Sequence, residues 1–341
     1  MKILVVKTSS LGDVIHSLPA LTEAASKLFL DIDWVVEKSF SEVPHWHTRV
    51  KKVIPVELRK WRKKPFSSTT RREWKAFKKQ LLEEDYDIVI DAQGLMKSAF
   101  LARQADAHKI YGPNYKSAWE PLASLFYNHT VSVDPALHAV TRMRHLFAEV
   151  FEYKPQSTWL DYGIDRKKLK TTYKPRMNEY ICLCHGTTWK TKEWPEAYWY
   201  DLANQIASEG LGVLIPFGNS EEEARAKRIA EKCPSAEVLP KMSLSSIAGI
   251  LSEAKGVVAV DTGLGHLSAA LGVPCVSMYG PTDPVSTGAV GKNQKHLAGK
   301  ISCAPCLKEI CHLKSDVQIW PACFEKLSPK NVFTELSGLI K

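Results

Sequence analysis

The sequence predicts an α/β protein with two domains, each built on a parallel sheet, that face each other across a central cleft. Residues 3–7 and 256–260 are apolar, β-branched runs that end in polar, glycine-containing loops and continue as helix-like patterns. The chain has 341 residues, more than one compact core usually holds. Two strand–loop–helix units in a chain of this length indicate two nucleotide-type domains.

Strands and helices alternate through the first half of the chain. We expect strands at residues 2–7, 32–37, 53–56 and 87–91, one helix that starts near residue 13 and continues over 18–29, and another at 71–84. A polar loop, residues 8–12, follows the first strand, and residues 92–94 form a similar turn after the last one. Alternation of this kind is typical of a parallel sheet.

The second half repeats this alternation after a linker. Residues 159–178 have weak periodicity and several lysines, so we expect a first domain at residues 1–165 and a second at residues 179–328. Strands are expected at 180–184, 212–217, 257–260 and 275–279, and helices at 196–208, 221–232 and 244–253. Residues 329–341 are expected to form a helix that packs back on the first half.

Composition is that of a soluble globular protein, with 45% hydrophobic and 24% charged residues. No apolar run approaches the ~18–20 residues of a membrane-spanning helix. The chain enters its first strand directly, without a signal peptide. These features predict a cytoplasmic protein.

The net charge of +9 is concentrated in one segment. Residues 51–79 hold twelve Lys and Arg residues and two acids, a net charge of +10, with aromatic residues interleaved. Such a segment indicates an anionic partner, which could be a nucleic acid, an anionic membrane surface or a phosphorylated substrate. The most closely spaced cations are Arg59, Lys60, Arg62, Lys63 and Lys64.

Three segments at strand ends carry candidate chemistry. Asp13, at the start of the first helix, is either a helix cap or a general base, and the helix N-terminus favours its ionised form. Residues 185–195, with threonines and lysines, suit a diphosphate or form an ordinary polar loop. Residues 261–263 begin a helix whose first N–H groups and dipole favour a phosphate.

Two common nucleotide signatures are missing from these loops. A nicotinamide-dependent dehydrogenase would carry G-x-G-x-x-G after a strand, and the loops ending at Gly12 and Gly265 both lack that pattern. The Walker A pattern is also absent. No Asp-x-Asp pair ends a strand, so the sequence does not indicate a metal-bound nucleotide diphosphate. The protein itself would then have to neutralise a diphosphate.

A cysteine cluster lies near the end of the chain, at Cys303, Cys306, Cys311 and Cys323. It could hold zinc or an iron–sulfur centre, or consist of redox-sensitive thiols. Its spacing fits no standard zinc ribbon, so we expect metal-free thiols with a structural role.

Six stretches spread in order over most of the chain resemble those of the bacterial lipopolysaccharide heptosyltransferases, the type I enzymes most closely. They are residues 7–16 (KTSSLGDVIH), 33–37 (DWVVE), 91–95 (DAQGL), 120–128 (EPLASLFYN), 261–266 (DTGLGH) and 279–284 (YGPTDP). The resemblance implies two Rossmann-like domains in the GT-B glycosyltransferase fold. It also implies an inverting enzyme, without metal or cofactor, that moves heptose from ADP-L-glycero-β-D-manno-heptose to the inner Kdo of Kdo2-lipid A.

The resemblance also implies roles for particular residues. Asp13 matches the catalytic base, and Lys192, with Thr187 and Thr188, matches the contacts to the diphosphate. Glu222 matches a ribose contact. The donor loop is matched by Asp261, Thr262, Gly263, Leu264 and His266. The basic residues 59–64 would then bind the phosphorylated lipid acceptor and the inner face of the cytoplasmic membrane, with no nucleic acid involved.

Two departures keep alternatives open. Trp119 stands where type I enzymes have a basic residue, and the cysteine-rich segment resembles type II enzymes, which add a later heptose. A basic nucleic-acid-binding protein would explain residues 51–79 but not the strand-end loops.

Overall fold

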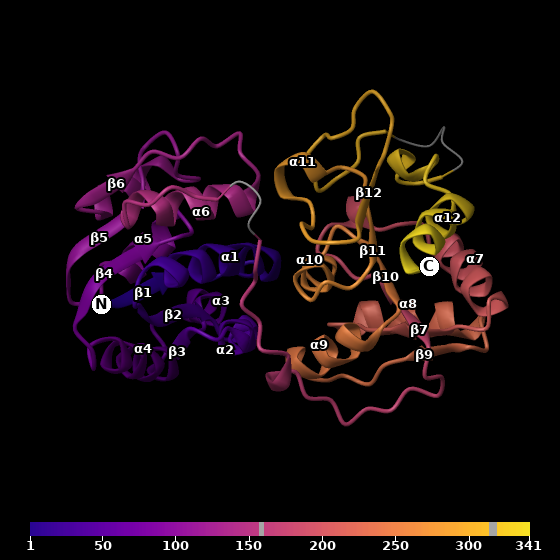
Figure 1. Ribbon diagram of the computed structural model, residues 1–341, viewed down its shortest axis with the longest axis horizontal. Helices are drawn as coiled ribbons and strands as arrows, with labels where there is room; N and C mark the ends of the chain where they lie inside the picture. Colours follow the sequence, from indigo (N-terminus) through magenta and orange to yellow (C-terminus); the bar gives the residue numbers. More distant parts are fainter. Residues whose placement is uncertain (157–159, 314–318) are drawn as a thin grey trace. The chain divides into compact units, whose positions relative to one another are not determined.

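The computed structural model describes residues 1–156, 160–313 and 319–341. It divides the chain into two compact units, Met1–Arg166 and Lys167–Lys341, called here the first and the second domain (Figure 1). The division falls within residues 159–178, where the sequence predicts a linker; of that segment, residue 159 lies outside the described residues. Tyr162 and Leu169 in this segment are buried.

The first domain contains a six-stranded sheet in the order β3-β2-β1-β4-β5-β6, and all of its neighbouring strands run parallel. The strands are β1 (Lys2–Val6), β2 (Asp31–Glu37), β3 (Val50–Val56), β4 (Tyr86–Asp91), β5 (Ala107–Pro113) and β6 (His129–Val131). The helices are α1 (Leu11–Lys27), α2 (Glu42–Trp46), α3 (Leu58–Lys63), α4 (Ser68–Leu81), α5 (Met96–Ala102) and α6 (Ala139–Val150). The central strand β1 is apolar throughout Ile3 to Val6 because helices cover both faces of a parallel sheet.

The second domain repeats this plan with the order β12-β11-β10-β7-β8-β9, again all parallel. Its strands are β7 (Tyr180–Cys184), β8 (Gly212–Ile215), β9 (Ala236–Val238), β10 (Gly256–Val260), β11 (Cys275–Tyr279) and β12 (Gln294–Ala298). Its helices are α7 (Glu196–Ser208), α8 (Ser220–Glu231), α9 (Leu244–Glu253), α10 (Gly263–Ala270), α11 (Pro284–Thr287) and α12 (Pro329–Ile340). When each domain's strands are numbered separately, both sheets have the Rossmann order 3-2-1-4-5-6.

Helix α1 begins earlier than the sequence pattern indicates. It starts at Leu11, because Ser10 and Asp13 form a capping box that closes its first turn. It also continues through Pro19, which the local pattern does not favour inside a helix. Strands β5, β6, β9 and β12 and helices α3 and α6 were not among the predicted elements. Two of these strands, β6 and β9, are only three residues long.

The predicted C-terminal helix is present as α12, and its packing contacts lie in the second domain. Helix α12 contacts α7, β10, β11 and β12 of its own domain. Val332 and Leu336 are fully buried in one cluster with Trp194 and Phe324. The apolar face of α12 is therefore taken up by the neighbouring sheet. Within the described ranges, no helix is long and apolar enough to cross a membrane.

Leu336→Ala should lower the stability of the second domain by about 2–5 kcal/mol, because it opens a cavity where Leu336 packs toward Gly256. Gly338→Ala, two residues along the same helix, meets nothing within 4 Å and should stabilise by about 0.5–1 kcal/mol. Thermal unfolding of both variants would measure this. An unchanged midpoint for Leu336→Ala would contradict the observed packing.

Candidate functional site

The topology of both sheets marks a point where a ligand is expected. In a Rossmann sheet, ligands bind beyond the carboxyl ends of the strands where the strand order reverses. That point lies between β1 and β4 in the first domain, and between β7 and β10 in the second. The candidate residues Asp13, Thr187 and Asp261 follow three of these four strands.

Asp13 is the third residue of α1 and is partly exposed. Its Oδ2 accepts hydrogen bonds from the backbone N–H and the hydroxyl of Ser10, both at 2.8 Å. The structure therefore gives Asp13 the capping role. Capping occupies one carboxylate oxygen in these contacts, so it does not exclude a second role for this side chain.

Two cations that sequence reasoning missed lie close enough to Asp13 to interact with its charge. Lys7 is buried, and its Nζ donates to the Ala92 carbonyl at 3.0 Å. Burial lowers the pKa of Lys7, and the Asp13 carboxylate opposes this effect. Burial likewise lowers the pKa of Arg142, again opposed by Asp13. The local pattern gave no signal for Arg142, since α6 is far from Asp13 in sequence.

Arg142 also contacts the tryptophan that departs from the type I pattern. Its guanidinium carbon lies 4.8 Å from the centre of the Trp119 ring. Its buried Nε has no hydrogen-bond partner among the described residues. A cation therefore lies over Trp119, where the resemblance had placed a basic residue.

Asp91 and Gln93 join the loops that follow β1 and β4. The Gln93 side-chain oxygen accepts from the backbone N–H groups of Thr8 and Ser9 at 2.8 and 3.1 Å. Asp91 is fully buried and accepts hydrogen bonds from Tyr127, Ser98 and the Gln93 backbone. Burial raises the pKa of Asp91, against the effect of these donors. The residues around Asp13 thus rest on a fixed polar scaffold.

In the second domain, Asp261 is the centre of the candidate site. This carboxyl group is 8% exposed, and its Oδ2 lies 2.7 Å from Lys192 Nζ and accepts from the Thr282 hydroxyl at 2.8 Å. His266 Nε2 lies 3.7 Å from the other oxygen. Burial opposes the charge of Asp261, but His266 and Lys192 hold the pKa of this carboxyl well below its usual value. Asp261 is therefore a permanent anion that fixes a cation beside it.

The loops after β7 and β10 meet around this anion. The Thr187 hydroxyl donates to the Asp261 carbonyl at 3.1 Å, whereas Thr188 is exposed. Lys192 Nζ also lies 4.4 Å from the centre of the Trp189 ring. Helix α10 begins at Gly263 with Thr262 as its N-cap, and the Thr262 side chain makes no capping bond to the described residues. The first N–H groups of α10, at Gly263 and Leu264, suit an anion.

Glu222 lies beside this site, at the start of α8. Its Oε2 accepts from the Gly218 N–H at 2.6 Å. A Cβ at Gly186 would lie 2.5 Å from the Glu222 carboxyl carbon, so the Glu222 carboxylate lies directly against the backbone of the loop after β7. The predicted donor residues of β7, β8 and β10 thus come together at one edge of the sheet.

The predicted basic segment forms α3 and the turn after it. Lys60 is paired with Glu73 at 2.6 Å. The other four cations, Arg59, Arg62, Lys63 and Lys64, are exposed and have no acidic partner among the described residues. The apolar pattern of residues 71–84 also predicts that Trp74, Phe77 and Leu81 face the core; Phe77 and Leu81 are buried there, and Trp74 is partly buried against it. Lys60 is therefore less available to a ligand than its four neighbours.

The cysteine-rich segment contacts the loops that follow β7 and β11. Its four thiols line one small cavity together with Pro281 and Thr191. The Thr191 hydroxyl donates to the Lys308 carbonyl at 2.8 Å, and the Leu307 N–H donates to the Pro281 carbonyl at 2.8 Å. Burial raises the pKa of Cys323 to about 12. Across residues 1–156, 160–313 and 319–341, no group of three or more metal-ligating side chains is arranged to hold an ion.

Two Rossmann-like domains in one chain are the architecture of the GT-B glycosyltransferase fold. The family model of glycosyltransferase family 9 (heptosyltransferase) matches residues 74–316. The chain belongs to this family.

Relatives of known name agree with that assignment. The chain is 47% identical over 350 residues to lipopolysaccharide heptosyltransferase 1 of Pseudomonas aeruginosa, covering 100% of this chain and 98% of the relative. The Escherichia coli K12 protein of the same name is 48% identical over 296 residues, covering 86% of this chain and 92% of the relative. The solved structure of E. coli heptosyltransferase WaaC with ADP-2-deoxy-2-fluoro heptose is 42% identical, with a TM-score of 0.84 and 99% of both chains covered.

His185, the first residue of the loop after β7, is buried, and neither of its ring nitrogens has a partner among the described residues. Burial, with the nearby Arg225 charge, lowers its pKa to about 3. The unfolded chain, with a His pKa of about 6.5, therefore binds more protons than the folded chain between these values. The contribution of neutral His185 to the free energy of unfolding is therefore fully present above about pH 6.5, and it is lost as pH falls toward 3.

His185→Phe should remove that pH dependence, which amounts to at most about 1.4 kcal/mol per pH unit in this window. Urea unfolding at pH 7.5 and pH 5.0 would measure it. The same change at the exposed His108 should leave the pH dependence of the wild type. Equal losses of stability at pH 5.0 in the wild type and His185→Phe would contradict a neutral buried imidazole.

Proposed function

We propose that this chain transfers L-glycero-D-manno-heptose from ADP-heptose to the inner Kdo of Kdo2-lipid A, with inversion at the anomeric carbon. The observation that carries the proposal is the Asp261–Lys192 pair beside the free N-terminus of α10. Full-length relatives named lipopolysaccharide heptosyltransferase 1 support the type of acceptor. Proteins named heptosyltransferase 2 match at 28–29% identity over only 111–114 residues, which disfavours the type II reading.

The second domain would hold the donor. Lys192, kept in place by Asp261, lies where it can bind the diphosphate as a point charge. The hydroxyls of Thr187 and Thr188 and the first N–H groups of α10 would donate to the remaining phosphate oxygens. Glu222 would accept from the ribose. This set of donors neutralises the charge that develops on the leaving diphosphate, so transfer would need no metal.

The first domain would activate the acceptor. Asp13 would take the proton of the acceptor hydroxyl while that oxygen forms its bond to the anomeric carbon and the bond to the diphosphate breaks on the opposite face. Lys7 and Arg142, the cations close to Asp13, would favour an anionic acceptor group next to the base.

The exposed cations of α3 would bring the enzyme to its acceptor. Arg59, Arg62, Lys63 and Lys64 would contact acceptor phosphates and the anionic inner face of the cytoplasmic membrane, each contributing about 1 kcal/mol near such a surface. The enzyme would then act in the cytoplasm, peripherally at the membrane. Lys60 would add less, because Glu73 already pairs with it.

The test is to incubate the protein with ADP-heptose and Kdo2-lipid A and to weigh the products. A mass gain of one heptose on Kdo2-lipid A, and none on an acceptor that already carries a heptose, is expected. Transfer only to the heptosylated acceptor would establish the type II reaction instead.

Asp13→Asn should lower kcat at least about 100-fold, because the amide preserves the contacts with Ser10 but takes up no proton. The affinity for ADP-heptose, measured by calorimetry, should stay unchanged. Asp106→Asn, at an exposed position of the same domain, serves as control. Retention of more than about a tenth of the wild-type kcat would reject Asp13 as the base.

Lys192→Ala should lower kcat/KM for ADP-heptose about 100- to 1,000-fold, because it removes one preorganised donor and exposes the diphosphate to the Asp261 anion. Lys190→Ala, two residues away and paired with Glu193 and Glu221, should change this value less than threefold. Steady-state kinetics of both variants would measure kcat/KM for ADP-heptose. Similar losses in both would mean that general loop charge, and not Lys192, serves the diphosphate.

A further inference from the structure

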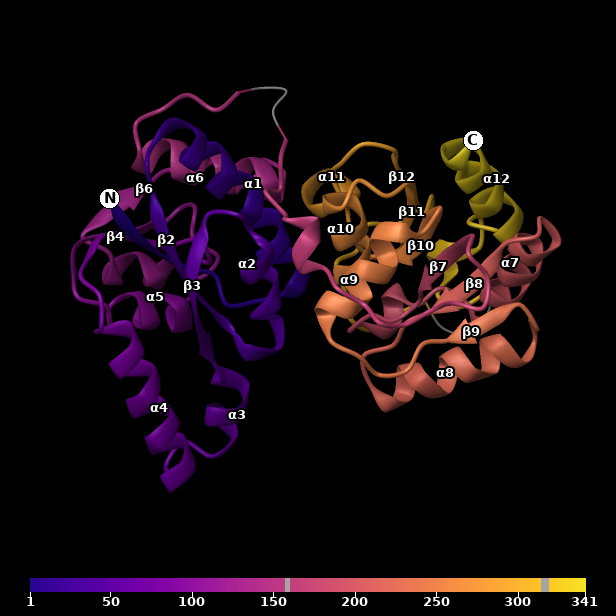
Figure 2. The ribbon, with the colours of Figure 1, turned by 60° about the horizontal axis from the view of Figure 1, so that its bottom comes forward.

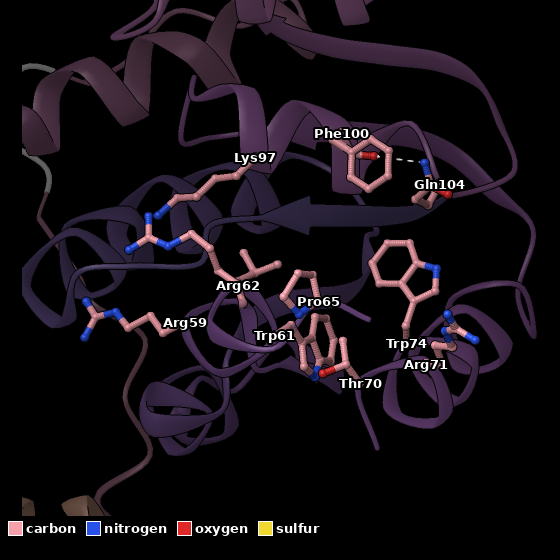
Figure 3. Close-up of a pocket in the computed structure, with 11 residues that line it drawn as sticks. Arg59, Trp61, Arg62, Pro65, Thr70, Arg71, Trp74, Lys97, Phe100 and Gln104 are labelled. Atoms are coloured by element: carbon pink, nitrogen blue, oxygen red, sulfur yellow. Dashed lines mark hydrogen bonds between the residues drawn. The ribbon is translucent and has the colours of Figure 1, made fainter. Parts of the chain in front are cut away.

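A cavity of about 750 Å³ lies in the first domain, between α3, α4 and α5 (Figure 3). Ligand pockets of small molecules fall in this size range. Figure 2 shows α3 and α4 extending from the body of the domain. None of the roles derived above uses its aromatic side chains.

One side of this cavity is aromatic. Trp74 and Phe100 stack with their ring centres 5.7 Å apart at an angle of 17°, and Trp61 meets Trp74 edge to face at 5.8 Å. Phe100 is nevertheless 46% exposed. An aromatic surface that a soluble domain leaves open marks a site for an apolar ligand.

The two uncharged polar side chains of the lining, Thr70 and Gln104, are already engaged. The Thr70 hydroxyl donates to the Lys64 carbonyl at 2.8 Å, and the Gln104 amide donates to the Phe100 carbonyl at 3.3 Å. A nucleobase or sugar would find few hydrogen-bonding partners on this wall. The wall therefore suits a hydrocarbon chain better than a polar ring.

The opposite side of the cavity is cationic. Figure 3 shows the head groups of Arg59, Arg62 and Lys97 on one side and the rings of Trp74 and Phe100 on the other, with a fourth cation, Arg71, beside Trp74. No acidic residue lines the cavity, and none of Arg59, Arg62 and Lys97 has an acidic partner within the described residues. An occupant that satisfies both sides carries an anion next to an apolar chain.

Two helices that line the cavity begin at the edge of the sheet where the proposed base, Asp13, lies. Helix α3 follows the carboxyl end of β3, and α5 follows that of β4, so both begin at the edge where Asp13 follows β1. Gln93 links the β4 loop to the β1 loop at 2.8 Å. A molecule held in the cavity is thus anchored on the acceptor side of the reaction.

We propose that this cavity binds one acyl chain of the acceptor glycolipid, with an acceptor phosphate on Arg59, Arg62 and Lys97. The chain lies along Trp74 and Phe100. This proposal rests on the proposed function, because it takes the acceptor to be an acylated, phosphorylated glycolipid. It adds a second recognition element, for the lipid itself, to the charge contacts of α3.

The test compares Phe100→Asp with Phe29→Asp, which changes an 82% exposed phenylalanine just before β2 at the opposite edge of the sheet. Each variant is assayed with Kdo2-lipid A and with the same acceptor after removal of all acyl chains. Phe100→Asp should lower kcat/KM for the acylated acceptor about tenfold, the equivalent of about two methylene groups returned to water. The new carboxylate lies one turn from Lys97 on α5 and disfavours phosphate from either acceptor, so kcat/KM for the deacylated acceptor should also fall, but clearly less than for the acylated one. The KM for ADP-heptose should stay within twofold of wild type, and Phe29→Asp should change none of these values.

Equal effects of Phe100→Asp on both acceptors, or no effect on either, would overturn the proposal. So would a loss of binding to phosphatidylglycerol vesicles with no change in the preference for the acylated acceptor, which would assign the cavity to a membrane phospholipid.

A second measurement separates this proposal from the proposed function. Calorimetry of the full chain with dodecyl phosphate should show binding that Phe100→Asp weakens about tenfold and that Phe29→Asp preserves. If no acceptor is glycosylated but this pattern holds, the proposed function fails and an alkyl-phosphate site remains. If transfer to Kdo2-lipid A occurs and dodecyl phosphate binds both variants equally, the cavity proposal fails alone.

Discussion

The second domain is organised around one buried charge. A carboxylate that is 8% exposed must be paired, and Asp261 meets this requirement through Lys192, Thr282 and His266. These partners come from the segments after β7, β10 and β11, so a single anion fixes three loops that are far apart in sequence. The cysteine-rich segment secures the same loops from outside, through Thr191 and Pro281. The ammonium of Lys192 is therefore held in place before a ligand binds. A charge held in this way needs no reorganisation when it stabilises charge in a transition state.

In the first domain, different groups hold together the loops at the reversal of strand order. At its strand-order reversal, the buried group that ties the loops together is the neutral side chain of Gln93, while Asp91 below it is saturated by donors. The Asp13 carboxylate, which accepts hydrogen bonds from Ser10, is instead partly exposed at a helix start, beside Lys7 and Arg142. A buried, fully paired acid such as Asp261 has no capacity left to accept a proton from a substrate. Asp13 is partly exposed and only partly paired, so its carboxylate keeps the capacity to accept a proton.

Sequence reasoning identified both sheets because their central strands are continuous apolar runs between polar turns. It singled out the loops of Asp13, Thr187 and Asp261 because each follows such a strand. The resemblance supplied the roles of Asp13, Thr187 and Lys192, and those roles stay proposals. Sequence reasoning missed β6 and β9, since three residues carry no periodicity, and it missed α6, and with it Arg142. It predicted α12 but not which strands α12 packs against, because an amphipathic pattern shows that a face is buried but not against what. The cavity beside Trp74 depends on three helices meeting in space, and no local pattern reports that.

Added salt should affect anion binding differently at the proposed sites of the two domains. Lys192 is 15% exposed and held against a buried carboxylate, so added salt screens its field only weakly. Arg59, Arg62 and Lys97 are exposed, and their attraction for phosphate decays over a Debye length of about 8 Å at physiological ionic strength. Recognition of the donor should therefore persist in salt that abolishes attraction of an acceptor by charge alone. An apolar subsite beside those cations would give the proposed acceptor a contribution to binding that salt does not screen, so acceptor binding would not depend on charge alone.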